Sequence, residues 1–145
     1  MRARTLHDGP PLALAIVLET GDAAVSALTR LAAERDLRAA HFSGVGAFQE
    51  VKLAYFDWER REYREMAVHE QVEALSVVGN VTRYEGGPRV HAHAVIGLRD
   101  GHVRGGHLLE ARVRPTLELL LVAWPTELRR ALDAEARIPL IDLAR

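Results

Sequence analysis

The segment that decides the fold is residues 90–108, VHAHAVIGLRDGHVRGGHL. Two short apolar and histidine-containing stretches flank an Arg-Asp-Gly sequence, a pattern that predicts a β-hairpin. His91 and His93 are two residues apart, so they share one face of the first strand. The face on which His107 lies depends on the length of the turn.

Two turn lengths give opposite results for His107. A two-residue loop at 100–101 would place His107 opposite Ala94, on the wrong face. A three-residue loop at 99–101, a type I turn followed by a left-handed glycine, places His107 opposite His93. We favour the longer loop because Asp-Gly suits it as well as the tight loop. The later Gly-Gly pair could also absorb a bulge that restores the phase.

Three imidazoles on one sheet face predict a site for a divalent transition metal, with His91, His93 and His107 as ligands. The alternative is that each is a half-buried polar side chain bonded to a neighbouring carbonyl or carboxylate. His102 lies beside the turn and is the poorest candidate of the four. Three further histidines have no other histidine close by in the sequence and are not expected to bind metal: His7, His41 and His69.

The rest of the chain indicates an α+β fold. We expect a single compact domain over 1–145 with a mostly antiparallel, strongly curved sheet of about seven strands, one covering helix and a short C-terminal helix. Residues 1–9 are expected to be flexible. The expected strands are 12–18, 40–47, 49–58, 63–68, 72–84, the 90–108 hairpin and 116–124, and the expected helices are 22–35, with Asp22 as N-cap, and 127–136.

Composition excludes several classes of protein. The 145 residues carry a formal charge of -1, so no overall field draws the chain to DNA or to an anionic membrane. The chain has no cysteine, which excludes disulfides and a thiolate nucleophile. No apolar run is long enough to span a membrane, and the first residues lack a secretion signal. We therefore expect a cytoplasmic protein.

Five motifs together resemble a known family. They are GVGAFQEVKLAYF at 44–56, LSVVGNV at 75–81, GGPRVHAH at 86–93, GGHL at 105–108 and RPTLE at 114–118. Their order and spacing are similar to those of the PPC domain, the plants-and-prokaryotes-conserved domain. The resemblance spans nearly the whole chain.

The resemblance implies an α/β fold on an antiparallel sheet, assembled as a homotrimer. Plant members carry an AT-hook that binds the minor groove of A/T-rich DNA, whereas this chain has no Arg-Gly-Arg-Pro core. The histidines at 91, 93 and 107 match positions that prokaryotic relatives use for a bound metal, with zinc expected. The apolar strand 117–124 shows little alternation and predicts burial on both faces, by a neighbouring subunit or by the chain's own helix.

Further residues are candidates for a ligand pocket: Gly44, Gly46, Asn80, Gly86 and Gly87, although the glycines are equally explained as bends in a curved sheet. Catalysis would need a base. Glu110 is expected on the face opposite His107, and Glu50, Asp57 and Asp100 are more simply solvated carboxylates. Four arginines either form a local anion-binding patch or lie separately at solvent-exposed strand positions: Arg83, Arg89, Arg104 and Arg112.

Three functions follow from these observations. The preferred one is an oligomeric metal-binding module that acts through an unknown protein or small-molecule partner, in a binding or regulatory role. The second is a DNA-binding protein by kinship with the AT-hook relatives, which the charge supports only weakly. The third and least favoured is a metal-dependent hydrolase or lyase.

Overall fold

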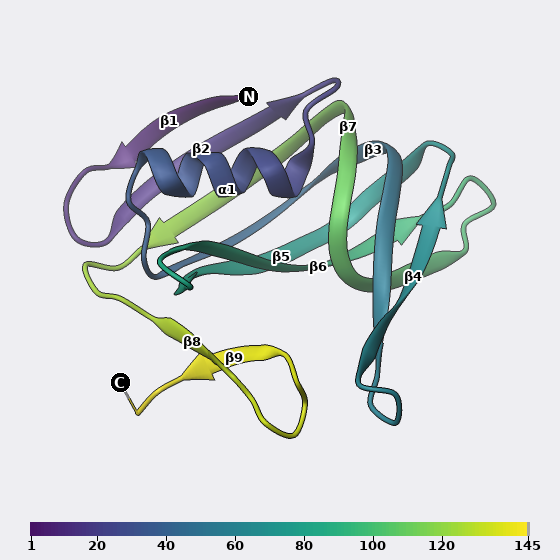
Figure 1. The fold of residues 1–145 in the computed structure, drawn as a ribbon. Coiled ribbons are helices and arrows are strands. Elements are labelled where there is room, and N and C mark those ends of the chain that lie inside the picture. The colour runs from purple at the N-terminus through teal and green to yellow at the C-terminus, as the bar shows by residue number, and fades with distance from the viewer. Residues whose placement is uncertain (145) are drawn as a thin grey trace.

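The computed structural model describes residues 1–144, in which nine strands form one sheet and one helix packs against it (Figure 1). The elements are β1 (Arg2–His7), β2 (Leu12–Glu19), α1 (Ala24–Glu34), β3 (Ala40–Asp57), β4 (Glu62–Val68), β5 (Val72–Tyr84), β6 (Gly87–Gly97), β7 (Val103–Ala123), β8 (Arg129–Leu132) and β9 (Pro139–Asp142). The predicted single domain with a mostly antiparallel sheet and one covering helix is thus confirmed, although the sheet has nine strands where about seven were expected. Within residues 1–144, no helix has the length and apolar character that crossing a bilayer requires.

Two long, bent strands shape the sheet. The first half of β3 pairs with 117–123 of β7, and its second half pairs with 107–113 after several register shifts. Because β5 and β6 also connect β3 to β7, these four strands form a closed ring of pairings. Residues 40–47 and 49–58, predicted as two strands, are therefore one continuous strand that changes direction at a bulge.

Glycines allow β3 and β7 to approach closely where they bend. A Cβ on Gly44 would lie 2.1 Å from the carbonyl oxygen of Glu118, and one on Gly46 would lie 2.2 Å from that of Thr116. Contacts this short are impossible for real side chains. The structure therefore explains both glycines by backbone packing.

The core lies between α1 and one face of the sheet. Its largest fully buried side chains include Phe42, Phe48, Leu117 and Leu121 on β3 and β7. From α1, a stripe at helical spacing faces them: Ala24, Ala27, Leu28, Leu31 and Ala32. The prediction of Asp22 as the N-cap of α1 is wrong. Ala23 occupies that position, and the carboxylate of Asp22 accepts a hydrogen bond from the backbone N–H of Glu19.

The opposite face of the sheet is open over several apolar residues. Leu120 pairs with Ser43, Ser43 with Val78, and Val78 with His93, so these four side chains form one row on the same face. Leu120 is 60% exposed and Val78 is 45% exposed. Residues 117–124 are therefore not buried on both faces within one chain, since only alternate side chains enter the core.

The predicted C-terminal helix at 127–136 is wrong. Residues 129–132 and 139–142 form the β8–β9 hairpin, which lies apart from α1 in Figure 1. The apolar spacing there is compatible with a helix, but the backbone forms hydrogen bonds with other segments. The N–H of Leu128 donates to the carbonyl of Arg38, and the carbonyl of Leu128 accepts from the N–H of Arg83. Tertiary hydrogen bonds to β5 and to the segment before β3 thus override a weak local preference. At the other terminus, residues 2–7 form β1 and pair with β2.

Candidate metal centre

The hairpin register brings the predicted ligands to one face. Leu98 and His102 close the turn, with the Leu98 N–H donating to His102 at 2.8 Å, and Gly101 has a φ of 85°. The pairing then runs without a bulge to His93 opposite His107. The three-residue loop is therefore confirmed, and its left-handed position is the one that favours glycine.

The three histidines form a compact cluster. One potential ligand nitrogen from each of His91, His93 and His107 lies within 4.8 Å of the other two. The ring centroids are 5.0 to 5.4 Å apart. His91 and His93 come from β6 and His107 comes from β7, so two hydrogen-bonded strands fix their backbone positions.

The surroundings keep two of the rings neutral. Burial, followed by the positive charge of Arg130 and the neighbouring histidines, lowers the pKa of His91 from 6.5 to about 4. Burial, followed by His93, Arg89 and Arg130, lowers the pKa of His107 to about 4 as well. Both imidazoles are therefore neutral at neutral pH, and a neutral imidazole has one ring nitrogen whose lone pair can bind a metal ion.

Neighbouring side chains cover the cluster from two sides. The Tyr63 ring of β4 lies 4.8 Å from the His107 ring, centroid to centroid. Arg130 of β8 approaches from the C-terminal hairpin, with its Nη2 atom 3.2 Å from Nδ1 of His91. The Nδ1 atom of His107 is buried and has no hydrogen-bond partner among the described residues. A buried nitrogen without a partner is costly in a purely structural role.

The donor set fits a divalent transition metal such as zinc. Three neutral imidazoles are a known zinc ligand set, which leaves one tetrahedral position for water or another ligand. A tetrahedral site with bonds of about 2.1 Å needs nitrogens roughly 3.4 Å apart, and the three ligand nitrogens lie within 4.8 Å of one another. His93 is exposed, while His91 and His107 are half-buried.

The carboxylates considered as bases are engaged elsewhere. Glu110 turns away from the cluster and accepts the backbone N–H groups of Val25 and Ser26 at the start of α1. The remaining three contact basic side chains elsewhere: Glu50 contacts Arg112 and His69, Asp57 contacts Arg64, and Asp100 contacts His102. The predicted opposite orientation of Glu110 is confirmed.

The five predicted pocket residues lie in different places. Gly44 and Gly46 pack against β7, while Gly86 and Gly87 lie at the turn between β5 and β6. Asn80 contributes to the surroundings of the cluster, because its Oδ1 atom accepts a hydrogen bond from Arg130. A cavity of about 160 Å³ is lined by both Gly86 and Arg130.

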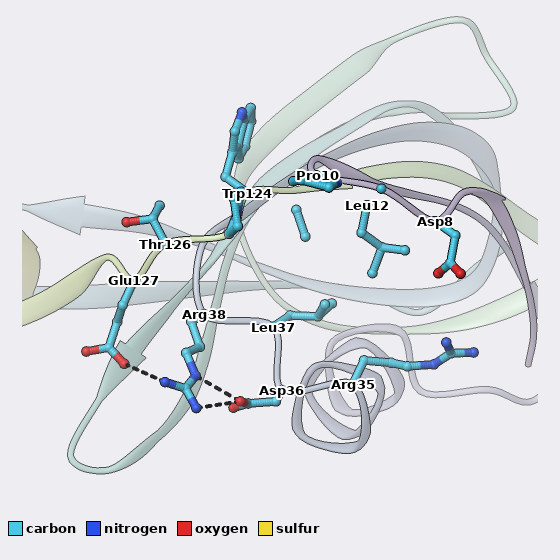
Figure 2. A pocket seen from close by; sticks show the side chains of 13 residues that line it. Asp8, Pro10, Leu12, Arg35, Asp36, Leu37, Arg38, Trp124, Thr126 and Glu127 are labelled. Carbon is cyan, nitrogen blue, oxygen red and sulfur yellow. Dashed lines mark hydrogen bonds and ion pairs between the residues drawn. The ribbon is translucent and has the colours of Figure 1, made fainter.

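A larger cavity lies elsewhere. It has a volume of about 620 Å³ and is lined by Leu12, Trp124 and the 35–38 segment, among others (Figure 2). Three of its charged groups pair with one another, since Arg38 binds Asp36 and reaches Glu127 at 3.9 Å. These ion pairs join the end of α1 to the β7–β8 connection, which is a structural role.

Sequence reasoning missed Arg130 and Tyr63. Arg130 was assigned to a helix that does not form, and nothing in its spacing signals contact with residue 91. Of the four arginines named as a patch, Arg89 acts on the cluster, whereas Arg83 and Arg112 bind carbonyl oxygens of Gly86 and Gly21. They do not form one patch.

The family assignment follows from a match over most of the chain. Residues 10–125 match the model of the Plants and Prokaryotes Conserved (PCC) domain. The chain belongs to this family. The PCC domain and the PPC domain are two names for the same family, so the resemblance inferred from the five motifs is confirmed. No curated protein is significantly similar to the chain.

Solved structures of PPC-like proteins share the fold. A metal-containing protein from Archaeoglobus fulgidus is 29% identical, with 95% of this chain and 98% of that chain covered and a TM-score of 0.86. A PPC protein from Pyrococcus horikoshii is 26% identical over 90% of both chains, with a TM-score of 0.85. A provisionally assigned DNA-binding protein from Ralstonia eutropha is 27% identical over 90% of both chains, with a TM-score of 0.84.

Proposed function

We propose that this PPC-domain protein is an oligomeric metal-binding module with a divalent ion, zinc in the first instance, held by His91, His93 and His107. The observation that carries the proposal is the convergence of three ligand nitrogens within 4.8 Å. The lowered pKa values of His91 and His107 support it, because they leave both rings neutral. The metal content of the Archaeoglobus relative adds independent support.

Metal analysis of untagged protein tests this site. We expect about one equivalent of metal in the wild type and a large loss in both His91→Ala and His107→Ala. His102→Ala is the matched control, because His102 lies on the same hairpin but pairs with Asp100 at the turn. Metal content that stays unchanged in both ligand variants would end the proposal.

The oligomeric state is part of the same proposal, with a homotrimer expected. Its support is the open sheet face, where five apolar side chains are 40% to 60% exposed: Val45, Leu75, Val78, Val95 and Leu120. Contiguous exposed apolar surface marks association sites. His93 lies in the same row as two of them, so the assembly would also shield the metal centre. Light scattering of the purified protein measures the subunit count.

DNA binding is the second candidate, and the Ralstonia relative is the observation in its favour. The near-neutral charge of this chain predicts weak binding with little dependence on salt. Fluorescence anisotropy with an A/T-rich duplex, at about 50 and about 200 mM salt, separates the two candidates. Strong A/T-selective binding at the higher salt would favour DNA as the partner.

A further inference from the structure

Arg130 is a charged side chain that the metal proposal does not use. Three hydrogen bonds of 2.9 Å fix its guanidinium: Nε donates to Thr82 Oγ1, Nη1 to the carbonyl of Pro139, and Nη2 to Asn80 Oδ1. Thr82 is fully buried, and Asn80 and Thr82 belong to β5. The C-terminal hairpin is thus anchored so that Arg130 lies against the histidine cluster.

The fourth contact of Arg130 joins it to a predicted ligand. Its Nη2 atom lies 3.2 Å from Nδ1 of His91. Arginine has five N–H donors and no acceptor, so His91 must accept this hydrogen bond. Four of the five N–H groups are then used, and the fifth, on Nη1, remains available to a ligand.

This hydrogen bond and metal coordination by His91 exclude each other. If the metal binds Nδ1, it takes the lone pair that Arg130 uses. If the metal binds Nε2 of a neutral ring, Nδ1 carries the hydrogen and cannot accept. In either case, metal binding releases one N–H group of Arg130, which then has two to offer beside the ion.

The charges around these donors select an anion. All four partners of Arg130 are neutral groups, and a divalent ion would add positive charge next to the guanidinium. Arg89 lies two residues before His91 on β6, so it leaves the same face of the sheet. A carboxylate can place one oxygen on the metal and accept arginine N–H groups with the other. Two free donors suit a carboxylate better than a phosphate, which has more oxygens to satisfy.

We propose that metal binding transfers Arg130 from His91 to a carboxylate, so that the metal ion and Arg130 together bind a small carboxylate-bearing molecule. This inference rests on the proposed metal function and names the class of its ligand. The open metal position and the arginine act as one site, and the two binding events are positively coupled. By linkage, the carboxylate strengthens metal binding by the same factor.

The test uses cobalt-substituted protein, whose visible absorption reports ligands on the metal. The probes are glycolate, its neutral analogue glycolamide, and inorganic phosphate. Glycolate should change the spectrum saturably, and glycolamide should bind at least about tenfold more weakly, the effect of losing one charge-assisted hydrogen bond. Phosphate that binds more tightly than glycolate would overturn the choice of carboxylate.

Arg130→Lys keeps the charge and loses the forked donors, so glycolate should bind at least about tenfold more weakly. Arg129→Gln is the matched control, because Arg129 is the exposed neighbour of Arg130 on the same strand. This variant should bind glycolate as tightly as the wild type does. An Arg130→Lys protein that binds cobalt and glycolate like the wild type would overturn the inference and leave the metal proposal intact. Wild-type protein that binds no cobalt would instead overturn the metal proposal.

A variant that fails to fold does not remove the test. Wild-type protein titrated with glycolate by calorimetry, with and without zinc, measures the coupling directly. The inference requires tighter binding to the zinc form by at least about tenfold. Equal affinity for the two forms would overturn it.

Discussion

Replacing Glu110 with alanine should destabilise the protein without removing its metal. The carboxylate of Glu110, on β7, accepts the Val25 N–H at 2.7 Å, the Ser26 N–H at 3.1 Å and the Ser26 hydroxyl at 2.6 Å. These amides belong to the first turn of α1, whose own N-cap residue, Ala23, provides no side-chain hydrogen bond. Glu110 therefore caps the helix from a distant strand.

The magnitude follows from this capping role. Loss of an N-cap costs about 1–2 kcal/mol. Loss of the negative charge at the helix N-terminus adds about 0.3–1 kcal/mol. Together they give about 2 kcal/mol, which for a chain of this size lowers Tm by roughly 4–8 °C. Glu110→Gln retains one oxygen acceptor and should lose roughly half as much.

Thermal unfolding followed by circular dichroism measures this effect, with metal content determined on the same samples. Glu34→Ala is the control, because Glu34 is exposed at the other end of α1, where it pairs with Arg30 at 3.8 Å. Exposed pairs of this kind contribute about 0.5 kcal/mol or less. A Glu110→Ala protein that is no less stable than the control would refute the capping argument. If Glu110→Ala lost its metal, Glu110 would contribute to the histidine cluster after all.

Three further predictions concern pH, assembly and backbone packing. Since the pKa of His91 and His107 is near 4 in the folded state and 6.5 when unfolded, the unfolded chain binds more protons between these values. The free energy of unfolding of the metal-free protein should therefore fall as the pH is lowered from 6.5 to 4. If a variant with both His91→Ala and His107→Ala lost as much stability over this range, the fall would not come from these two histidines. Leu120→Lys should lower the oligomeric state in light scattering, because it places a charge in the open apolar face; an unchanged mass would remove Leu120 from the interface. Gly44→Ala should reduce stability by about 2 kcal/mol or more in urea unfolding, since its Cβ would collide with the Glu118 carbonyl; a wild-type midpoint would show that β3 and β7 separate easily.

Sequence reasoning worked where the signal was local. The alternation around His91 and His93 and the Arg-Asp-Gly turn together reduced the hairpin phase to two choices and favoured the correct one, because a strand repeats every two residues and the turn has few allowed lengths. The helical stripe ending near Arg35 was equally clear. These features depend on neighbours within about ten residues, which a pattern records.

Sequence reasoning failed where distant segments compete. Leu128 and its neighbours have helical spacing, yet hydrogen bonds to Arg38 and Arg83 hold them extended. The cap of α1 comes from Glu110, more than eighty residues away, in place of the local Asp22. No local pattern carries either contact.

The amino-acid sequence alone determined the family, the hairpin and the three imidazoles that share a face, since periodicity and turn chemistry are properties of short segments. Only the tertiary structure decided what surrounds those imidazoles. Arg130 and Tyr63 reach the cluster because the chain folds a C-terminal hairpin and a long β-ribbon over it, and the burial they create is what keeps His91 and His107 neutral. Burial and charge at a point depend on every segment that packs there, so they exist only once the whole sheet has formed.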